Sequence, residues 1–143
     1  MSVGIVLPKT LIELSNRLSI RLEDPVHVSQ NFKTVRSMTT KMEKPRRVFT
    51  FLPSHVENSN SVIESLSKEM GPLDVVIDCY MGTKDDVFRR CKMCEENSTQ
   101  YLLAIMTRDT LVVHGGRTAY MENKNLLRKI KKHTYYAGPI NIV

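Results

Sequence analysis

The segment LDVVIDCY, residues 73–80, carries apolar side chains at successive positions instead of alternating them with polar ones. A strand with one wet face alternates, because successive side chains point to opposite faces of a sheet. A strand that is apolar on both faces belongs in the middle of a sheet that helices cover on both sides, and such sheets are mostly parallel. This segment therefore predicts an α/β fold, a layered mixed sheet with helices on both faces.

The rest of the chain fits this prediction as a single domain of 143 residues. Residues 1–45 are expected to form a strand, SVGIVLP, followed by a helical N-terminal arm, and Pro45 marks the joint to an α/β core over residues 46–143. Within the core, strands are expected at VFTFL, LDVVIDCY, QYLLAIM and TLVVH. The last two are joined by the polar residues 107–110, which suits a hairpin.

Helix starts are predicted where a capping residue precedes an acidic residue by three positions. This pattern occurs at residues 10–13, 54–57 and 83–86. A further helix is expected over residues 28–42, although the alternation of Val26 and Val28 leaves a strand open there. A basic C-terminal helix is expected over residues 125–133, followed by a tail that adds an edge strand or docks on another subunit.

Three cysteines lie close together in DCYMGTKDDVFRRCKMC, residues 78–94. Cys79, Cys91 and Cys94 with His114 form a conceivable zinc site, but structural zinc sites usually combine two close ligand pairs, and only one pair is present here. Buried thiols are the preferred interpretation, because unpaired cysteine behaves as a small apolar residue. No nucleophile and base form a catalytic signature, so the sequence predicts no metal, no cofactor and no enzyme.

Residues at the ends of the predicted strands give a weaker indication of a site. Ligands of open α/β sheets bind beyond the carboxyl ends of the parallel strands. This rule would gather Ser54, His55, Tyr80, Met81, Thr83 and Lys84 in one crevice. Helix capping alone would also explain Ser54 and Thr83.

Basic residues exceed acidic ones and give a formal net charge of +6, which favours an anionic partner. One cluster is RKIKK, with Arg128, Lys129, Lys131 and Lys132. It is followed by Tyr135 and Tyr136 and preceded by Arg117 and Tyr120. Basic groups next to aromatic rings that can stack on unpaired bases are typical of RNA-binding surfaces. A solvated helix with tyrosines packed on the tail would produce the same pattern.

A second basic cluster, KMEKPRR, contains Lys41, Lys44, Arg46 and Arg47. We expect it to form a secondary basic patch. The alternative is again a solvated helix end.

The segments DDVFRRCKMCEENSTQYLLAIM and TLVVHGGR resemble part of the anticodon-binding domain of class II aminoacyl-tRNA synthetases. The resemblance covers residues 47–133, with Phe88 and Arg89 on the helix and residues 101–106 as the following strand. The sequence lacks the catalytic motifs of a synthetase. Asn97, Ser98 and Thr99 replace the glycine that often precedes the strand in that family. The resemblance implies a non-synthetase relative that binds RNA or another protein.

These observations favour a non-catalytic module that binds RNA or another single-stranded nucleic acid through its basic C-terminal helix. The alternative is a self-associating structural or adaptor protein, viral or cellular, that uses its N-terminal helices and C-terminal tail to contact protein partners, for example as a homodimer. No apolar stretch reaches the roughly 18 residues of a membrane span, and no signal peptide is recognisable. An intracellular location, cytoplasmic or nuclear, is expected.

Overall fold

The structure is a computed structural model that describes residues 2–22, 26–30, 32–53 and 58–140. Strands and helices alternate along the chain. They are β1 (Ser2–Val6), the short 3₁₀ helix η1 (Lys9–Leu11), α1 (Ile12–Leu22), β2 (Val26–Ser29), the 3₁₀ helix η2 (Phe32–Thr34), α2 (Val35–Lys41), β3 (Arg46–Thr50), α3 (Ser59–Glu69), β4 (Val75–Asp78), α4 (Lys84–Glu96), β5 (Gln100–Met106), β6 (Thr110–Gly115), α5 (Arg117–Ile130) and β7 (His133–Tyr136).

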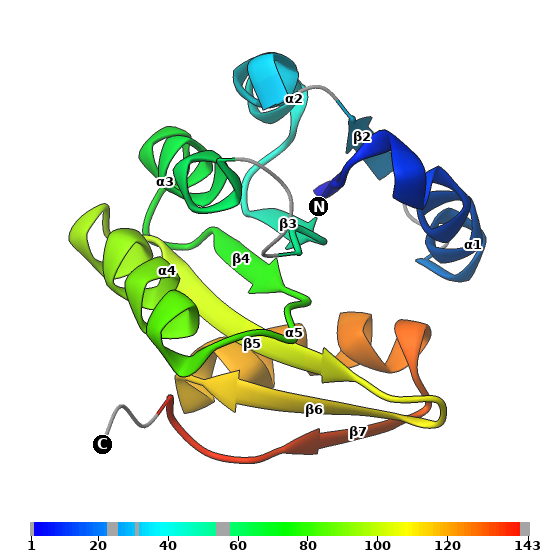
Figure 1. The fold of residues 1–143 in the computed structure, drawn as a ribbon. Helices are drawn as coiled ribbons and strands as arrows, with labels where there is room; N and C mark the ends of the chain where they lie inside the picture. The colour runs from blue at the N-terminus through cyan, green and yellow to red at the C-terminus, as the bar shows by residue number, and fades with distance from the viewer. Residues whose placement is uncertain (1, 23–25, 31, 54–57, 141–143) are drawn as a thin grey trace.

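The described strands form one sheet in the order β2-β1-β3-β4-β5-β6-β7 (Figure 1). Every neighbouring pair from β2 to β5 is parallel, β6 is antiparallel to β5, and β7 is parallel to β6. The turn between β5 and β6 is closed by the backbone N–H of Thr107, which donates to the carbonyl of Thr110 at 2.9 Å. The predicted mixed sheet and its hairpin are therefore confirmed.

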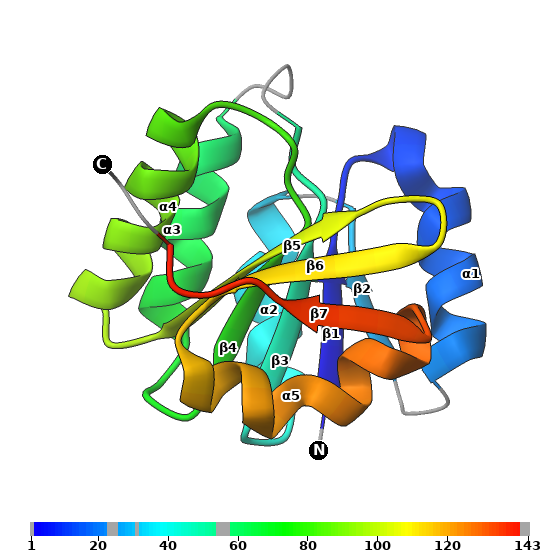
Figure 2. The same ribbon diagram turned by 90° about the horizontal axis from the view of Figure 1, so that it is seen from below.

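Helices cover both faces of the sheet, as the continuous apolar strand required. Figures 1 and 2 show α2, α3 and α4 on one face and α1 and α5 on the other. Successive strand residues feed two separate cores: Phe49 and Ile77 pack with the α1 and α5 face, while Val48 and Val76 pack with the α2, α3 and α4 face. All four side chains are fully buried. Burial on both sides thus explains why the first three positions of β4, Val75, Val76 and Ile77, are all apolar.

The N-terminal segment is built into the sheet. β1 lies between β2 and β3 and pairs in parallel with both, from Ser2 opposite Arg46 to Val6 opposite Thr50. The strand that the alternation of Val26 and Val28 left open is β2. The helix expected over residues 28–42 is shorter and is limited to η2 and α2.

The helix starts agree only in part with the capping patterns. Thr83 caps α4 as predicted, since its side-chain oxygen accepts from the backbone N–H of Asp86 at 3.2 Å. The pattern at residues 10–13 does not form a cap, because η1 precedes α1 and its N-cap residue is Pro8, which makes no side-chain cap. The pattern at residues 54–57 lies outside the described residues.

The C-terminal helix is longer than predicted, because α5 begins at Arg117 instead of Asn125. Its apolar residues Leu126, Leu127 and Ile130 are buried, as expected. The tail forms the predicted edge strand, β7. Among the described residues, no helix is long and apolar enough to cross a membrane.

Candidate functional site

The sheet has a topological switch point between β1 and β3. The chain leaves the carboxyl end of β1, forms β2 on one side of it and then returns to form β3 on the other side. The connections that follow β1 and β3 therefore diverge, and they leave a crevice above the carboxyl ends of these strands. This is the part of an open α/β sheet where ligands usually bind.

A basic groove of about 570 Å³ lies at this switch point. Its walls come from the residues that follow β1 and β2 and from the first turns of α3. The two charged groups among the described lining residues, Lys9 and Lys33, are both cationic, so the groove suits an anionic ligand. The described residues that line it are Pro8, Lys9, Gln30, Lys33, Asn58, Ser61, Val62 and Ser65.

The turn from β1 to α1 contains no glycine. The sequence has none between Gly4, which lies within β1, and Gly71. Instead, Pro8 opens η1, and the N–H of Leu11 donates to the carbonyl of Pro8 at 3.0 Å. Dinucleotide-binding folds usually place a glycine-rich turn here, so that the backbone can approach a pyrophosphate closely. In this protein, the positive group at that turn is the side chain of Lys9.

A second, apolar hollow of about 290 Å³ lies farther along the same edge. It opens above the ends of β3, β4 and β5, on the face that α1 covers. Its surface is mainly hydrocarbon, with a thiol and a phenol, and it suits a flat, weakly polar group. The residues that line it are Leu14, Phe51, Pro53, Cys79, Tyr80, Met81, Ala104 and Met106.

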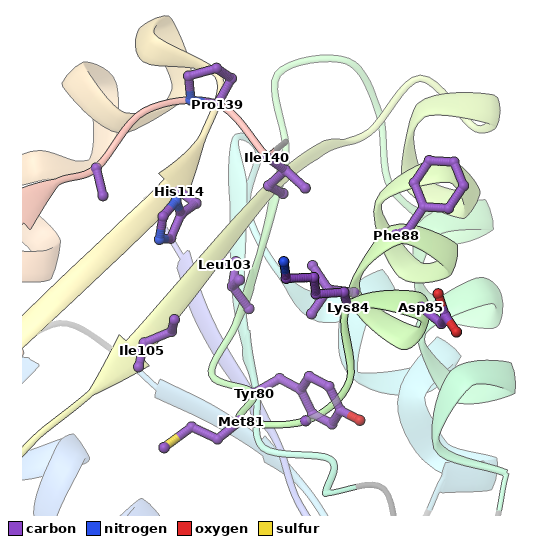
Figure 3. A pocket seen from close by; sticks show the side chains of 13 residues that line it. Tyr80, Met81, Lys84, Asp85, Phe88, Leu103, Ile105, His114, Pro139 and Ile140 are labelled. Carbon is purple, nitrogen blue, oxygen red and sulfur yellow. The ribbon is translucent and has the colours of Figure 1, made fainter. Parts of the chain in front are cut away.

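A third hollow, about 800 Å³, lies on the opposite face between α4, the hairpin of β5 and β6 and the C-terminal tail (Figure 3). Leu103 and Ile105 form its floor, and Phe88 and Ile140 flank it. We call it the α4 hollow. Because Tyr80 and Met81 line both the α4 hollow and the apolar hollow, the turn after β4 separates the two spaces.

A buried guanidinium fixes the edge of the sheet beneath these spaces. Arg90 of α4 is fully buried and donates to both carboxylate oxygens of Asp78, at 3.1 Å each. It also donates to the carbonyl of Leu52 and to the side chains of Ser59 and Asn60. One side chain thereby joins α4 to the ends of β3 and β4 and to the start of α3.

Asp78 is surrounded by donors. Besides Arg90, it accepts from the hydroxyl of Tyr101 at 2.6 Å and from that of Thr50 at 3.0 Å. Burial raises the pKa of Asp78, while the charge of Arg90 and these hydrogen bonds counteract part of the increase. Burial also raises the pKa of Tyr101. Because Asp78 and Tyr101 are hydrogen-bonded to each other inside the protein, we assign this cluster a structural role.

Tyr80 is held firmly in the turn after β4. Its ring lies 4.0 Å from the guanidinium carbon of Arg90, and its hydroxyl donates to Asp86 at 2.8 Å. A Cβ at Gly82 would lie only 2.0 Å from that ring, so glycine is required for the turn to pass beside it. Hydrogen bonds from Asn60 and Tyr80 lower the pKa of Asp86, which keeps it ionised as their acceptor.

The three cysteines do not form a common site. Cys79 packs against the core on the α1 and α5 face, whereas Cys91 and Cys94 belong to the core on the other face. Among the described residues, no three potential ligands come close enough to hold a metal ion.

Their thiols are predicted to react slowly. Burial, followed by the charge of Glu95, raises the pKa of Cys91 to about 12, from its ordinary value of 9.0. The thiolate is the reactive form, so at pH 8 this shift reduces alkylation about a thousandfold. Mass spectrometry after iodoacetamide treatment should show this protection in native protein and its loss in guanidinium chloride. Rapid labelling of native Cys91 would contradict it.

The aromatic residues expected to stack on bases are largely used within the protein. Tyr120 is buried, and its ring stacks on that of Tyr136 with centroids 5.0 Å apart. The hydroxyl of Tyr136 donates to the carbonyl of Gly115 at 2.6 Å. Only Tyr135 of the three is well exposed, at 57%. Of the two rings expected to stack on bases, Tyr136 is packed against Tyr120, and Tyr135 remains exposed.

The basic residues near the C-terminus remain at the surface, but two of them are tied to the fold. Lys129 donates to the carbonyl of Leu22 at 3.3 Å, and Lys131 donates to that of Arg108 at 3.1 Å. The exposed members of the predicted group are Arg117, Arg128, Lys129 and Lys132.

The secondary basic patch does not form as predicted. Arg46 and Arg47 are buried, and Arg46 donates from Nε to Asp74 at 3.0 Å. Only Lys41 and Lys44 of the predicted group are exposed. Half of the expected positive charge is therefore inside the protein.

The crevice predicted from the strand ends is found in part. Tyr80, Met81 and Lys84 line the α4 hollow, Thr83 caps α4, and residues 54–57 lie outside the described residues. Sequence reasoning missed the basic groove, because Lys9 and Lys33 are isolated lysines in unrelated segments. Only the strand order brings them together.

No protein-family model and no curated protein matches this sequence. Solved structures do match. An imine reductase from Myxococcus stipitatus in complex with NAD+ has a TM-score of 0.78 at 8% identity and covers 97% of this chain and 55% of its own. A 3-hydroxyisobutyrate dehydrogenase from Mycobacterium tuberculosis has a TM-score of 0.70 at 15% identity, covering 97% and 55%. A 6-phosphogluconate dehydrogenase from Plasmodium falciparum has a TM-score of 0.70 at 21% identity, covering 97% and 32%.

The chain shares the fold of these oxidoreductases. It spans about half the length of the first matched structures. The resemblance to an anticodon-binding domain is therefore wrong. The matches also contradict the two expectations that the chain is a non-enzymatic module and that its partner is a nucleic acid.

Proposed function

We propose that this chain is the nucleotide-binding domain of an oxidoreductase, and that the basic groove receives the phosphorylated adenosine half of a nicotinamide dinucleotide. The position of that groove at the switch point between β1 and β3 carries the proposal. Several solved structures of the same fold are oxidoreductases, and two of them are described with NAD+ or NADP+. When bound, such a cofactor supplies hydride transfer.

The residues after β2 favour a cofactor with an additional phosphate. An acidic residue after the second strand typically binds the ribose hydroxyls of NAD, whereas a basic residue accommodates the 2′-phosphate of NADP. The sequence contains no acidic residue from Val26 to Met42, and Lys33 lines the groove just after β2. We therefore assign NADP as the preferred cofactor.

The turn without glycine changes how the phosphates would be held. The backbone around Pro8 does not form the usual close cradle, so Lys9 and Lys33 would supply the positive charge through their side chains. Gln30, Asn58 and Ser61 would donate or accept hydrogen bonds around the ribose and base. The apolar hollow beyond β3 and β4 has the size and polarity for a flat ring.

The test is calorimetric titration of the purified protein with NADP+ at low salt. Replacing Lys9 and Lys33 together with alanine should weaken binding at least about tenfold, because each charge-assisted contact contributes about 1.5–3 kcal/mol. The matched control replaces Lys41 and Lys92, two exposed lysines outside the groove, and removes the same charge. Absence of binding to the unmodified protein, or an equal loss in both variants, would refute the proposal.

The proposal includes an intracellular location. The three cysteines are unpaired, which suits a reducing compartment.

A further inference from the structure

We infer that the α4 hollow is a second binding site, one that takes a small organic acid with an apolar body. Its volume of about 800 Å³ lies within the range of small-molecule sites, which are largely apolar and contain a few convergent polar groups. This inference goes beyond the proposed function. It stands whether or not a nucleotide occupies the basic groove.

The apolar part of the ligand has a well-defined surface to contact. Leu103 and Ile105 project from β5 on the face that α4 leaves open, and Phe88 and Ile140 close the sides (Figure 3). Phe88 is still 38% exposed, and Met81 in the adjacent turn is 79% exposed. Covering these side chains would remove apolar surface from water, which favours binding.

Two polar groups enter the same space from opposite sides. Figure 3 shows Lys84 reaching across the hollow from α4 and His114 facing it from β6. Within the described part of the chain, no hydrogen bond or ion pair engages the ammonium of Lys84 or the imidazole of His114. Asp85 also lines the hollow, but in Figure 3 its carboxylate is directed away from Lys84 and His114. A cation and an imidazole without a facing carboxylate define a site for an anionic oxygen group.

The position of Lys84 is not explained by helix stability. It is the first residue of α4, where the helix dipole favours acidic side chains and disfavours cations. Asp85 and Asp86 satisfy that preference in the next two positions. The residues one turn later on the same side of α4 are Val87 and Phe88, which offer no charge to pair with Lys84. A bound carboxylate would give this exposed ammonium a charged partner.

The test uses 4-phenylbutyrate as the probe, with its neutral amide, 4-phenylbutyramide, for comparison. Titration followed by ¹H–¹⁵N NMR should shift the backbone signals of residues 81–88, 103–105 and 114. The acid should bind about tenfold more tightly than the amide, because only the acid forms a charge-assisted contact. Equal affinities, or shifts confined to other parts of the protein, would overturn the inference.

Variants of one lysine separate a binding role from a structural one. Lys84→Gln should weaken binding of the acid about tenfold and leave the amide unchanged, and Lys84→Arg should keep affinity within about threefold. Lys92→Gln, on the exposed side of the same helix, is the matched control and should have no effect. A loss of acid binding in both glutamine variants would indicate nonspecific attraction and contradict the assignment. The titration contains no nucleotide, so its result is independent of the NADP+ experiment.

Discussion

Replacing Arg90 with methionine is expected to lower the free energy of unfolding by about 3–5 kcal/mol. The change leaves Asp78 fully buried without its cation, and it removes the donors to Leu52, Ser59 and Asn60. Removing one partner of a buried ion pair is costly because the remaining charge has no solvent to replace it. Urea denaturation measures the effect, and the melting temperature should fall by roughly 10 °C or more.

Two further variants make this experiment specific. Arg89→Ala, one residue earlier on the exposed side of α4, should change stability by less than about 0.5 kcal/mol. Adding Asp78→Asn to Arg90→Met should cost less than the two single changes summed, because the asparagine no longer carries an unpaired charge. Strict additivity of the two changes would show that the ion pair does not couple α4 to β4.

Replacing Gly115 with alanine is expected to cost about 2–3 kcal/mol. Gly115 ends β6 with a φ of +146°, a backbone conformation that side chains disfavour. A Cβ there would lie 2.8 Å from the carbonyl oxygen of Tyr101 and 2.7 Å from Cδ2 of Leu102. β5 would therefore have to move, and thermal or urea unfolding would detect the loss.

The neighbouring glycine provides the control. Gly116 has an ordinary φ of −65°, and a Cβ there meets nothing within 4 Å. Gly116→Ala should therefore cost less than about 1 kcal/mol. If the two variants were equally stable, the close approach of β6 to β5 would not be the reason for glycine at position 115.

The architecture of the sheet could be predicted from the sequence, because a strand that is buried on both faces has apolar residues at consecutive positions. Residues 75–77 are apolar at consecutive positions, and β4 indeed contributes to both cores. The N-terminal arm was harder to assign. β2 is four residues long at the edge of the sheet, and its pattern is too short to separate a strand from a helix.

The site was less accessible, because its residues are distant in the sequence. Lys9 and Lys33 face one groove only because β1 and β2 are parallel neighbours. Tyr120 and Tyr136 seemed available to a ligand next to a basic run, but their 5.0 Å stack buries one ring and half-buries the other. The fold could not be identified from the usual glycine-rich turn, because this chain has Pro8 and Lys9 at that position.

The fixed position of Tyr80 has a consequence for the two spaces that it separates. Its hydroxyl is anchored to Asp86 and its ring to Arg90, so the side chain is fastened at both ends. It forms a stationary partition between the apolar hollow and the α4 hollow. Ligands in the two hollows would therefore contact opposite sides of the same fixed side chain, and neither would have to displace it in order to bind.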